Sequence, residues 1–242
     1  MLLPHRAGLD QPDHVHILPG PPPVSVVLTR SARARRLTLR VSRLDGRVTL
    51  TLPHRMAIAP ALAFLHDREP WLRGQLARQP AAETPAPGGS LPWLGAEVPL
   101  RSGPVRRATW DQGALLLPDD GKPAGPRLVA LLKTAARDRL AAACDRHATA
   151  LGHRFTRITL RDTRSRWGSC SSAGALMFSW RIAMAPPAVI DYLAAHEVAH
   201  LARMDHSPAF WAIVARLCPG YKAARAWLRH EGDRLLRIDF GV

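Results

Sequence analysis

The sequence predicts an α+β protein, because groups of short strand-like segments are followed by longer helix-like segments along its 242 residues. Segments rich in β-branched and aliphatic residues, each bounded by glycine, proline or charged residues, are typical of short strands. Apolar residues that recur every three or four positions, as between Arg127 and Leu151, are typical of an amphipathic helix. A helix-like run after Pro187 is apolar nearly all round, so we expect it to lie in a hydrophobic core.

The N-terminal part is predicted to be rich in strands. Residues 24–78 combine alternating β-branched segments with a helical stretch, 57–78, which Pro70 is expected to divide in two. Asp45-Gly46 is typical of a hairpin turn between the second and third strands. The predicted strands are 24–28, 37–41 and 48–52. Residues 1–23 are rich in proline, glycine and histidine, and we expect them to form a flexible leader.

A proline- and glycine-rich stretch, residues 79–92, predicts a linker or long surface loop before the larger C-terminal part, residues 93–242. This part is expected to begin with short strands and to continue into the amphipathic helix, which Gly152 is placed to cap. Further strands are expected over 155–160, 164–170 and 175–182, followed by a helix over 188–201.

Charge and cysteine content restrict the class of protein only loosely. The formal net charge is +15, from 34 basic residues against 19 acidic ones. Since only three of the basic residues are lysines, we attribute the excess chiefly to arginine-biased composition and leave a nucleic-acid partner open. Three widely spaced cysteines argue against a disulfide framework and favour a reducing compartment. Because no stretch approaches the roughly 20 apolar residues of a membrane span and no signal-peptide pattern occurs, we expect a cytoplasmic protein without membrane contact.

The run HEVAHLARMDH, residues 196–206, carries the chemistry. Residues four apart lie on one face of a helix, so His196 and His200 can bind one metal ion together. Imidazole nitrogens are good zinc ligands, and a catalytic zinc site has three protein ligands with one position left for water. Glu197 follows the first histidine and is placed to accept a proton from that water as a general base.

His206 is the third zinc ligand that we predict. On a continuous helix it would lie about 240° round from His200, where it could not share the ion. The chain must therefore leave the helix between residues 201 and 205. Ser207-Pro208 supports this prediction, because serine is a good N-cap and proline is favoured at the first position of a new helix.

Two other zinc arrangements share parts of this pattern. Metzincins have the same histidine spacing, but they carry a glycine where this chain has Arg203, and no methionine follows position 204 to form a Met-turn. We therefore exclude that clan. In other zincins the third ligand is a glutamate on a later helix, and Glu231 is the downstream residue that fits this description. Glu231 stays an alternative to His206.

The segment from RWGSC at residues 166–170 to HSPAFW at residues 206–211 resembles the YgjP-like metallopeptidases, relatives of the SprT-like and WLM zinc proteases. Together with segments further upstream, the likeness covers residues 24–239. It implies a zincin-like metallopeptidase core, in which the HExxH helix lies beside a small antiparallel sheet, with a β-rich N-terminal part. It also implies Zn²⁺ held by the three histidines, with Glu197 as the general base. One departure is Ser179, where the family is expected to have asparagine, and it puts a polar contact at that position in doubt.

The function that this resemblance implies is a zinc metallopeptidase acting on a peptide or protein substrate. A second interpretation is a metal-dependent pyrophosphatase acting on a nucleoside triphosphate such as UTP. A third is a nucleic-acid-associated binding module with a structural zinc, although structural zinc sites usually use cysteines. The physiological substrate and the oligomeric state do not follow from the sequence.

Several residues near the motif have two interpretations each. The side chains of Trp167, Ser169, Trp180 and Arg181 either face an extended peptide that adds to the strand edge or pack beneath the metal-binding helix. Tyr221 is a candidate for stabilising an oxyanion. Cys170 is expected to be a core thiol rather than a nucleophile.

Overall fold

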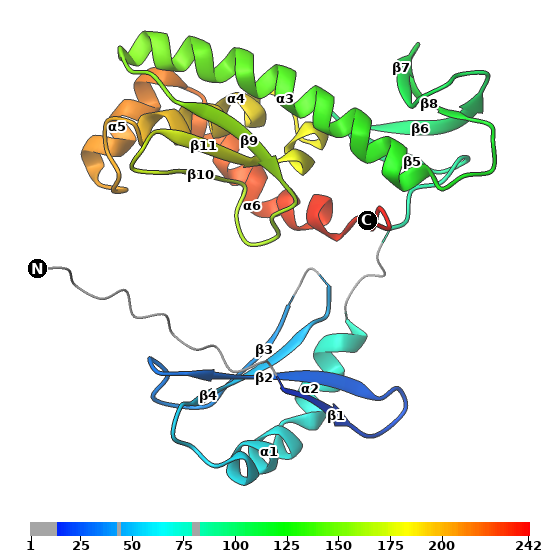
Figure 1. Cartoon of the computed structure of the whole chain (residues 1–242), viewed down its shortest axis with the longest axis vertical. Helices are drawn as coiled ribbons and strands as arrows, with labels where there is room; N and C mark the ends of the chain where they lie inside the picture. The colour runs from blue at the N-terminus through cyan, green and yellow to red at the C-terminus, as the bar shows by residue number, and fades with distance from the viewer. Residues whose placement is uncertain (1–13, 43–44, 79–82) are drawn as a thin grey trace, which may run out of the picture. The chain divides into compact units, whose positions relative to one another are not determined.

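Runs of strands are followed by runs of helices along the chain, which confirms the predicted α+β class (Figure 1). The structure is a computed structural model, and it describes residues 14–42, 45–78 and 83–242. It divides into two units, Met1–Ala81 and Ala82–Val242, each with a hydrophobic core of its own. The predicted metal-binding run lies in the second unit.

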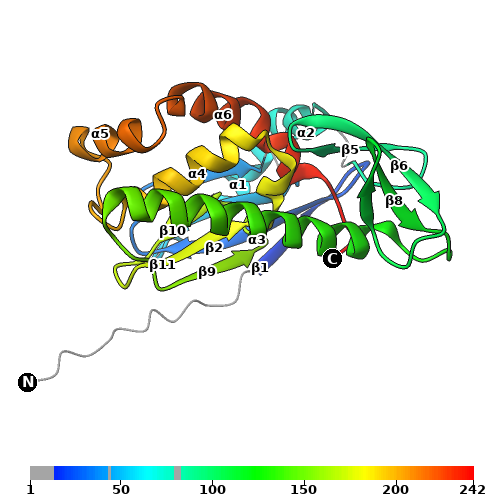
Figure 2. The ribbon, with the colours of Figure 1, turned by 90° about the horizontal axis from the view of Figure 1, so that it is seen from above.

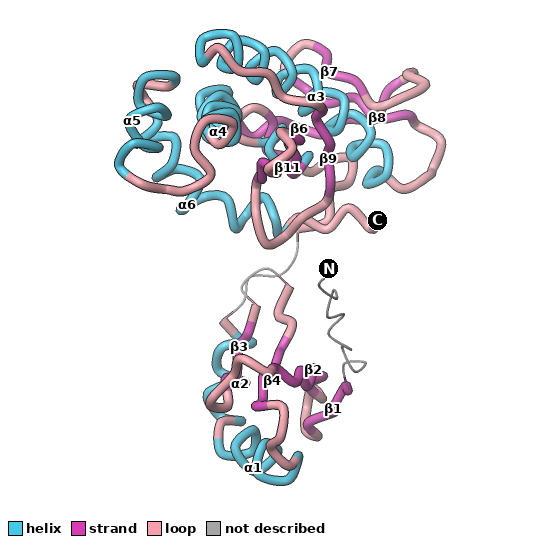
Figure 3. The backbone as a smooth tube through the Cα atoms, turned by 60° about the vertical axis from the view of Figure 1, so that its left-hand side comes forward, coloured by secondary structure: helices cyan, strands magenta, loops and turns pink. Residues whose placement is uncertain are grey.

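The first unit packs two helices on one face of a four-stranded sheet (Figure 3). The strand order is β1-β2-β4-β3, with β2 and β4 parallel and the two outer pairs antiparallel. The β3–β4 hairpin is the predicted one, since Val41 pairs with Val48 across the turn at Asp45-Gly46. The elements are β1 (His14–Leu18), β2 (Val24–Ser31), β3 (Thr38–Val41), β4 (Val48–Pro53), α1 (Ile58–Asp67) and α2 (Glu69–Ala77).

Part of the predicted leader is a strand instead. Residues 1–13 lie outside the described residues, but β1 pairs antiparallel with β2 and Leu18 is fully buried in the core. The Arg73 guanidinium donates hydrogen bonds to the carbonyls of Pro19 and Pro22, both at 2.7 Å. The prediction of a flexible leader up to residue 23 is therefore wrong for these residues, because pairing with β2 and contacts with α2 hold them.

The second unit begins with a small sheet at one end of the long helix α3 (Ala124–Leu151) (Figure 1). Residues 79–82 of the predicted linker lie outside the described part, and residues 90–92 belong to β5. The glycine cap of α3 is confirmed, since Gly152 has a φ of +74°, a conformation that glycine adopts without strain. The sheet has the order β5-β6-β8-β7 and consists of β5 (Ser90–Trp93), β6 (Ala96–Gly103), β7 (Thr109–Asp111) and β8 (Ala114–Pro118).

The sheet that precedes the metal-binding run contains β9 (Arg157–Arg161), β10 (Gly168–Cys170) and β11 (Ala175–Ser179). Its order is β10-β11-β9, with β10 antiparallel and β9 parallel to the central strand. The antiparallel sheet expected from the resemblance is therefore a mixed one. The reason is that the chain passes from β9 to the far edge before it returns, so β11 enters between β9 and β10.

The last part of the chain is helical. It comprises the 3₁₀ helix η1 (Trp180–Met184), α4 (Pro187–Ala199), α5 (Pro208–Leu217) and α6 (Tyr221–Arg237). Helix α4 contacts both α3 and α6 and is largely buried between them (Figure 2). No helix in the described ranges has the length and apolar content that crossing a membrane requires.

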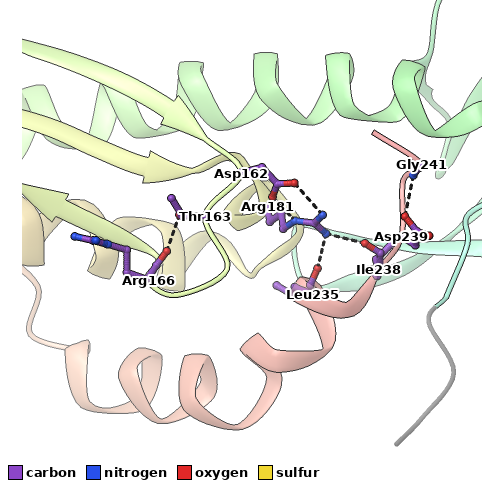
Figure 4. Close-up of polar contacts among 8 residues, drawn as sticks. All are labelled: Asp162, Thr163, Arg166, Arg181, Leu235, Ile238, Asp239 and Gly241. Atoms are coloured by element: carbon purple, nitrogen blue, oxygen red, sulfur yellow. Dashed lines mark hydrogen bonds and ion pairs between the residues drawn. The ribbon is translucent and has the colours of Figure 1, made fainter. Parts of the chain in front are cut away.

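A buried arginine connects three segments of this unit (Figure 4). The Arg181 guanidinium, 1% exposed, donates two hydrogen bonds to the Asp162 carboxylate, at 2.7 and 3.2 Å. It also donates to the carbonyls of Leu235 and Ile238 at the end of α6, at 3.2 and 2.8 Å. A buried cation is tolerated because each of its three nitrogens donates to at least one acceptor, so Arg181 stabilises the junction of β9, η1 and α6.

Arg181→Met is expected to lower the free energy of unfolding by about 3 kcal/mol, because it leaves a carboxylate and two carbonyls without their donor. The matched control is Arg161→Met, at an exposed position next to Asp162, for which we expect a change within about 0.5 kcal/mol. Urea denaturation of both variants measures the difference. A loss below about 1 kcal/mol for Arg181→Met would show that the guanidinium does not hold this junction.

Candidate metal centre

Helix α4 brings two histidines and a glutamate into apolar surroundings. The rings of His196 and His200 have centroids 5.1 Å apart, as expected for residues one turn apart. His200 is 8% exposed and Glu197 only 4% exposed. Buried polar groups are costly unless they bind one another or a ligand, so the composition of this helix itself indicates a binding site. The neighbouring buried residues are Tyr192, Leu193, Ala194, Ala195, Val198 and Ala199.

The third histidine comes from the corner between α4 and α5. The first helix ends at Ala199 and the next begins at Pro208, which confirms that the chain leaves the helix before His206. The Ser207 N–H donates to the Asp205 carboxylate at 3.1 Å, and the Ser207 hydroxyl accepts from the Phe210 N–H at 3.4 Å. This turn and N-cap fix the direction in which the chain enters α5, and so they place His206 beside α4.

The three imidazoles converge on one point. The Nε2 atoms of His196 and His206 are 3.2 Å apart, and one nitrogen from each of the three rings lies within 4.8 Å of the others. A tetrahedral zinc ion with nitrogen ligands at about 2.0–2.1 Å separates those nitrogens by about 3.3 Å. The separation of His196 and His206 fits such an ion, and the 4.8 Å limit for the whole group is wider, so the rings would draw closer around an ion. Within the described part of the chain, this group contains no fourth histidine, cysteine or acidic side chain.

Hydrogen bonding orients one of the rings. Nδ1 of His200 lies 2.9 Å from the Arg203 carbonyl, which can only accept, so Nδ1 carries the proton and Nε2 keeps a free lone pair. Nδ1 of His196 is buried and has no hydrogen-bond partner among the described residues. The His200 ring is therefore held in its tautomer by the main chain, whereas the polar contact of the His196 ring is the one between its Nε2 and that of His206.

Phe210 is the packing partner that the three imidazoles share. Its ring is fully buried, and its centroid lies 4.4 Å from that of His200, 4.9 Å from His206 and 5.0 Å from His196. Trp211 borders His196 and His206 on another side, with centroids at 5.6 and 6.0 Å. The start of α5 thus supplies an aromatic support that limits how far the imidazoles can rotate.

The histidines on α4 are held in the form that binds a metal. Burial, together with the neighbouring His200 and His206, lowers the pKa of His196 to about 3. Burial also lowers the pKa of His200, although the hydrogen bond to the Arg203 carbonyl opposes the shift. Both rings are therefore neutral at neutral pH, and a neutral imidazole offers a lone pair to a cation.

Gly168 makes room for the carboxyl group of Glu197. A Cβ atom at Gly168 would lie 2.5 Å from Oε1 and 2.8 Å from Cδ of Glu197, far closer than van der Waals contact. Burial raises the pKa of Glu197 to about 8, so without a cation nearby the group holds its proton at neutral pH. A cation among the imidazoles opposes this shift and favours the carboxylate.

A comparison with known protein families identifies a family whose matched region contains the residues of this site. The sequence matches the family described as YgjP-like, metallopeptidase domain, over residues 35–231, which include the three histidines and Glu197. The chain belongs to the YgjP-like metallopeptidase domain family. Neither the curated proteins nor the solved structures gave a match. Membership in the YgjP-like family confirms the resemblance and supports a metallopeptidase-type hydrolase, with a metal ion as cofactor.

Two of the candidates lie outside the histidine group. Glu231 is exposed on α6 and does not join the three imidazoles, so the geometry favours His206. The Tyr221 ring stacks on Trp211 with centroids 5.6 Å apart, which places it one ring away from His196 and His206.

Burial raises the pKa of the Cys170 thiol, as expected for a packed thiol and not for a nucleophile.

The residues near β10 are divided between packing and exposure. Trp180 and Arg181 are each 1% exposed, so they are packed inside the unit and do not face a peptide, and the 3₁₀ helix that carries them contacts α3, α6 and β5. Trp167 and Ser169 are half-buried, and the Trp167 ring lies so close to α6 that a Cβ at Gly232 would be 3.1 Å from it. The Ser179 hydroxyl is buried and makes no hydrogen bond with any described residue. The polar contact that the sequence put in doubt at position 179 is therefore not made by this serine within the described residues.

Sequence reasoning missed the roles of Gly168 and Phe210. A glycine inside a predicted strand is a signal of close approach by another group, but the sequence does not say which group approaches. Phe210 follows the N-cap by three residues, and its contact with all three imidazoles depends on the angle between α4 and α5, which the sequence does not give.

The metal-free protein is expected to be most stable between about pH 4.5 and 6.5. The pKa of Glu197 rises on folding from 4.5 to about 8, so its contribution to stability is lost as the pH rises through that range. The pKa of His196 falls from 6.5 to about 3, so its contribution is lost as the pH falls through that range. In urea denaturation, Glu197→Gln should abolish the decline in the free energy of unfolding between pH 6.5 and 8. Glu231→Gln, at an exposed position, should leave that decline unchanged. If the free energy of unfolding of wild type and of Glu197→Gln depended on pH in the same way, the decline above pH 6.5 would not come from Glu197.

Proposed function

We propose that the protein is a zinc-dependent peptidase of the HExxH type, with His196, His200 and His206 as zinc ligands. The observation that carries the proposal is the convergence of three imidazoles within 4.8 Å, two of them from the helix turn that also carries the buried Glu197. A ligand set made of histidines alone, next to a glutamate, is typical of catalytic zinc sites, whereas structural sites usually contain cysteines.

Zinc in this position would polarise a scissile carbonyl and lower the pKa of a water molecule towards ~7. The remaining chemistry is that of Glu197. Its carboxylate accepts a proton from the attacking water and delivers it to the nitrogen of the leaving amine. The low exposure of Glu197 keeps bulk water from competing for that proton, and Gly168 keeps the carboxyl group in one place.

Strand β10 offers a place for the substrate backbone. It lies at the edge of its sheet, paired with β11 on one side, and it contacts α4. An extended peptide can add to such an edge through main-chain hydrogen bonds. Because Gly168 of this strand touches Glu197, a peptide on the edge would pass close to the general base. This arrangement supports a peptide substrate over a nucleotide.

A cytoplasmic location also belongs to the proposal. Cys144, Cys170 and Cys218 are free, and free thiols persist in reducing compartments.

Glu197→Gln is expected to retain zinc and to lose at least ~100-fold in the rate of casein hydrolysis, because the amide cannot accept the proton. Wild type and variant are compared on casein and on UTP, with and without a chelator, and zinc is measured by elemental analysis. Hydrolysis of UTP alone would replace the peptidase with the pyrophosphatase. Salt-dependent DNA binding without turnover of either substrate would favour a binding module with structural zinc.

His206→Ala is expected to lower zinc affinity at least tenfold, because it removes one of three ligands. Glu231→Ala is the matched control, since it removes a metal-binding side chain that lies outside the group, and it should leave affinity unchanged. Elemental analysis after dialysis against graded chelator gives both values. Lower zinc affinity in Glu231→Ala, together with unchanged affinity in His206→Ala, would assign the third ligand to Glu231.

Gly168→Ala is expected to lower kcat at least tenfold while zinc content stays the same, because the added methyl group displaces the Glu197 carboxylate and not the histidines. Gly220→Ala is the control, as a Cβ there meets nothing within 4 Å and the backbone φ is −79°. Equal kcat values for the two variants would show that the carboxyl group has room to move.

A further inference from the structure

A cavity of about 340 Å³ adjoins the proposed zinc site on the side of His200. It lies between the turn that joins β10 to β11 (residues 171–174), the connection from α3 to β9, and the residues that follow α4. Its volume is within the range of small-molecule sites. Since His200 is part of its wall, a group bound in this cavity would lie next to the proposed zinc site.

The walls of the cavity are fixed by main-chain contacts. The Thr156 N–H in the α3–β9 connection donates to the Gly174 carbonyl at 2.9 Å. A Cβ at Gly174 would lie 3.5 Å from the Leu201 side chain, so the turn packs directly on the residue after His200. The cavity is therefore formed by three connected segments, and its shape does not depend on a single loose loop.

The lining combines apolar and polar side chains. Leu201 and Met204 are its large apolar residues, and Met204 is 55% exposed. Arg154 and Ser172 are among its polar residues. No aspartate or glutamate lines the cavity, so nothing in its wall neutralises the guanidinium.

Arg154 is an arginine that lines this cavity, and no acidic side chain lines it beside the guanidinium. Arg146 pairs with Asp191 at 2.8 Å, and Arg181 pairs with Asp162. Within the described residues, neither the Arg154 side chain nor the Ser172 hydroxyl makes an ion pair or a hydrogen bond. An arginine fork and a hydroxyl are donors that suit a carboxylate.

Resting on the proposed peptidase function, we propose that this cavity is a specificity subsite for a carboxylate on the peptide substrate, which pairs with Arg154. The methylene groups of the bound residue contact Leu201 and Met204, and the carboxylate accepts from the guanidinium and from Ser172. The carboxylate belongs either to an aspartate or glutamate side chain or to the end of the substrate chain. A nucleoside triphosphate, with several negative charges, would require more cations than this one arginine.

The test measures binding to the full-length, zinc-loaded Glu197→Gln protein, with loading checked by elemental analysis. The probes are fluorescein-labelled, C-terminally amidated decapeptides of alanine and glycine that carry one Glu, Gln or Lys at each position in turn. A second series without acidic side chains compares a free terminal carboxylate with the amide. UTP is titrated alongside. Fluorescence anisotropy gives the Kd of each labelled peptide, and competition with a labelled peptide gives that of UTP.

We expect one position, or the free carboxylate, to bind about three- to fivefold more tightly with the negative charge than with the neutral amide, as for an exposed ion pair. Introducing Arg154→Glu into the Glu197→Gln protein should reverse this preference, so that the Lys peptide binds more tightly than the Glu peptide. Adding Arg157→Glu, an equal change of charge at an exposed position outside the cavity, should keep it. A preference for Glu in the first series identifies a side-chain carboxylate as the ligand. A preference for the free terminus in the second series identifies the terminal carboxylate.

Equal affinity for Glu and Gln at every position and for both forms of the terminus would overturn the subsite. So would equal effects of Arg154→Glu and Arg157→Glu, or loss of UTP binding in Arg154→Glu without any peptide preference. The two proposals fail separately. Wild type that leaves casein intact while the binding preference persists contradicts the peptidase alone, whereas casein cleavage without the preference contradicts the subsite alone.

Discussion

Two imidazoles and a carboxyl group on one buried helix are the constraint on which the rest of the second unit depends. Helix α4 lies between α3 and α6, so water cannot solvate these groups fully, and desolvation favours their neutral forms. The low pKa of His196 and the high pKa of Glu197 are two results of this one cause. A bound cation uses the neutral imidazoles and favours the carboxylate, so the metal and the fold stabilise each other.

Helix geometry also dictates where the third imidazole has to come from. Two residues on one helix face can approach a single ion, but a third ligand six residues later must lie off the helix. The chain meets this requirement with short-range bonds: the Asp205 and Ser207 side chains bind backbone N–H groups within three residues. Phe210 then packs against all three rings, so the same short segment that places His206 also supports His196 and His200.

The features that could be predicted from the sequence are those determined by nearby residues. The cap at Gly152, the hairpin at Asp45-Gly46 and the break before Ser207 each depend on a few consecutive residues, and the structure has all three. Features that depend on distant partners were wrong or missed. Strand β1 has a leader-like composition and is held by β2 and Arg73, and the parallel pairing of β9 with β11 depends on the path of the chain between them.

The missed glycine has the widest consequence for the proposed chemistry. Strand β10 contains only Gly168, Ser169 and Cys170, and it provides both the sheet edge and the clearance for Glu197. A larger residue at position 168 would displace either the carboxyl group or the strand, and a displaced strand would take the substrate edge with it. The position of the carboxyl group that we propose as the general base and the proposed position of the peptide are therefore set by one contact. Glycine, although unfavourable in a strand, is the residue whose lack of a side chain satisfies both requirements.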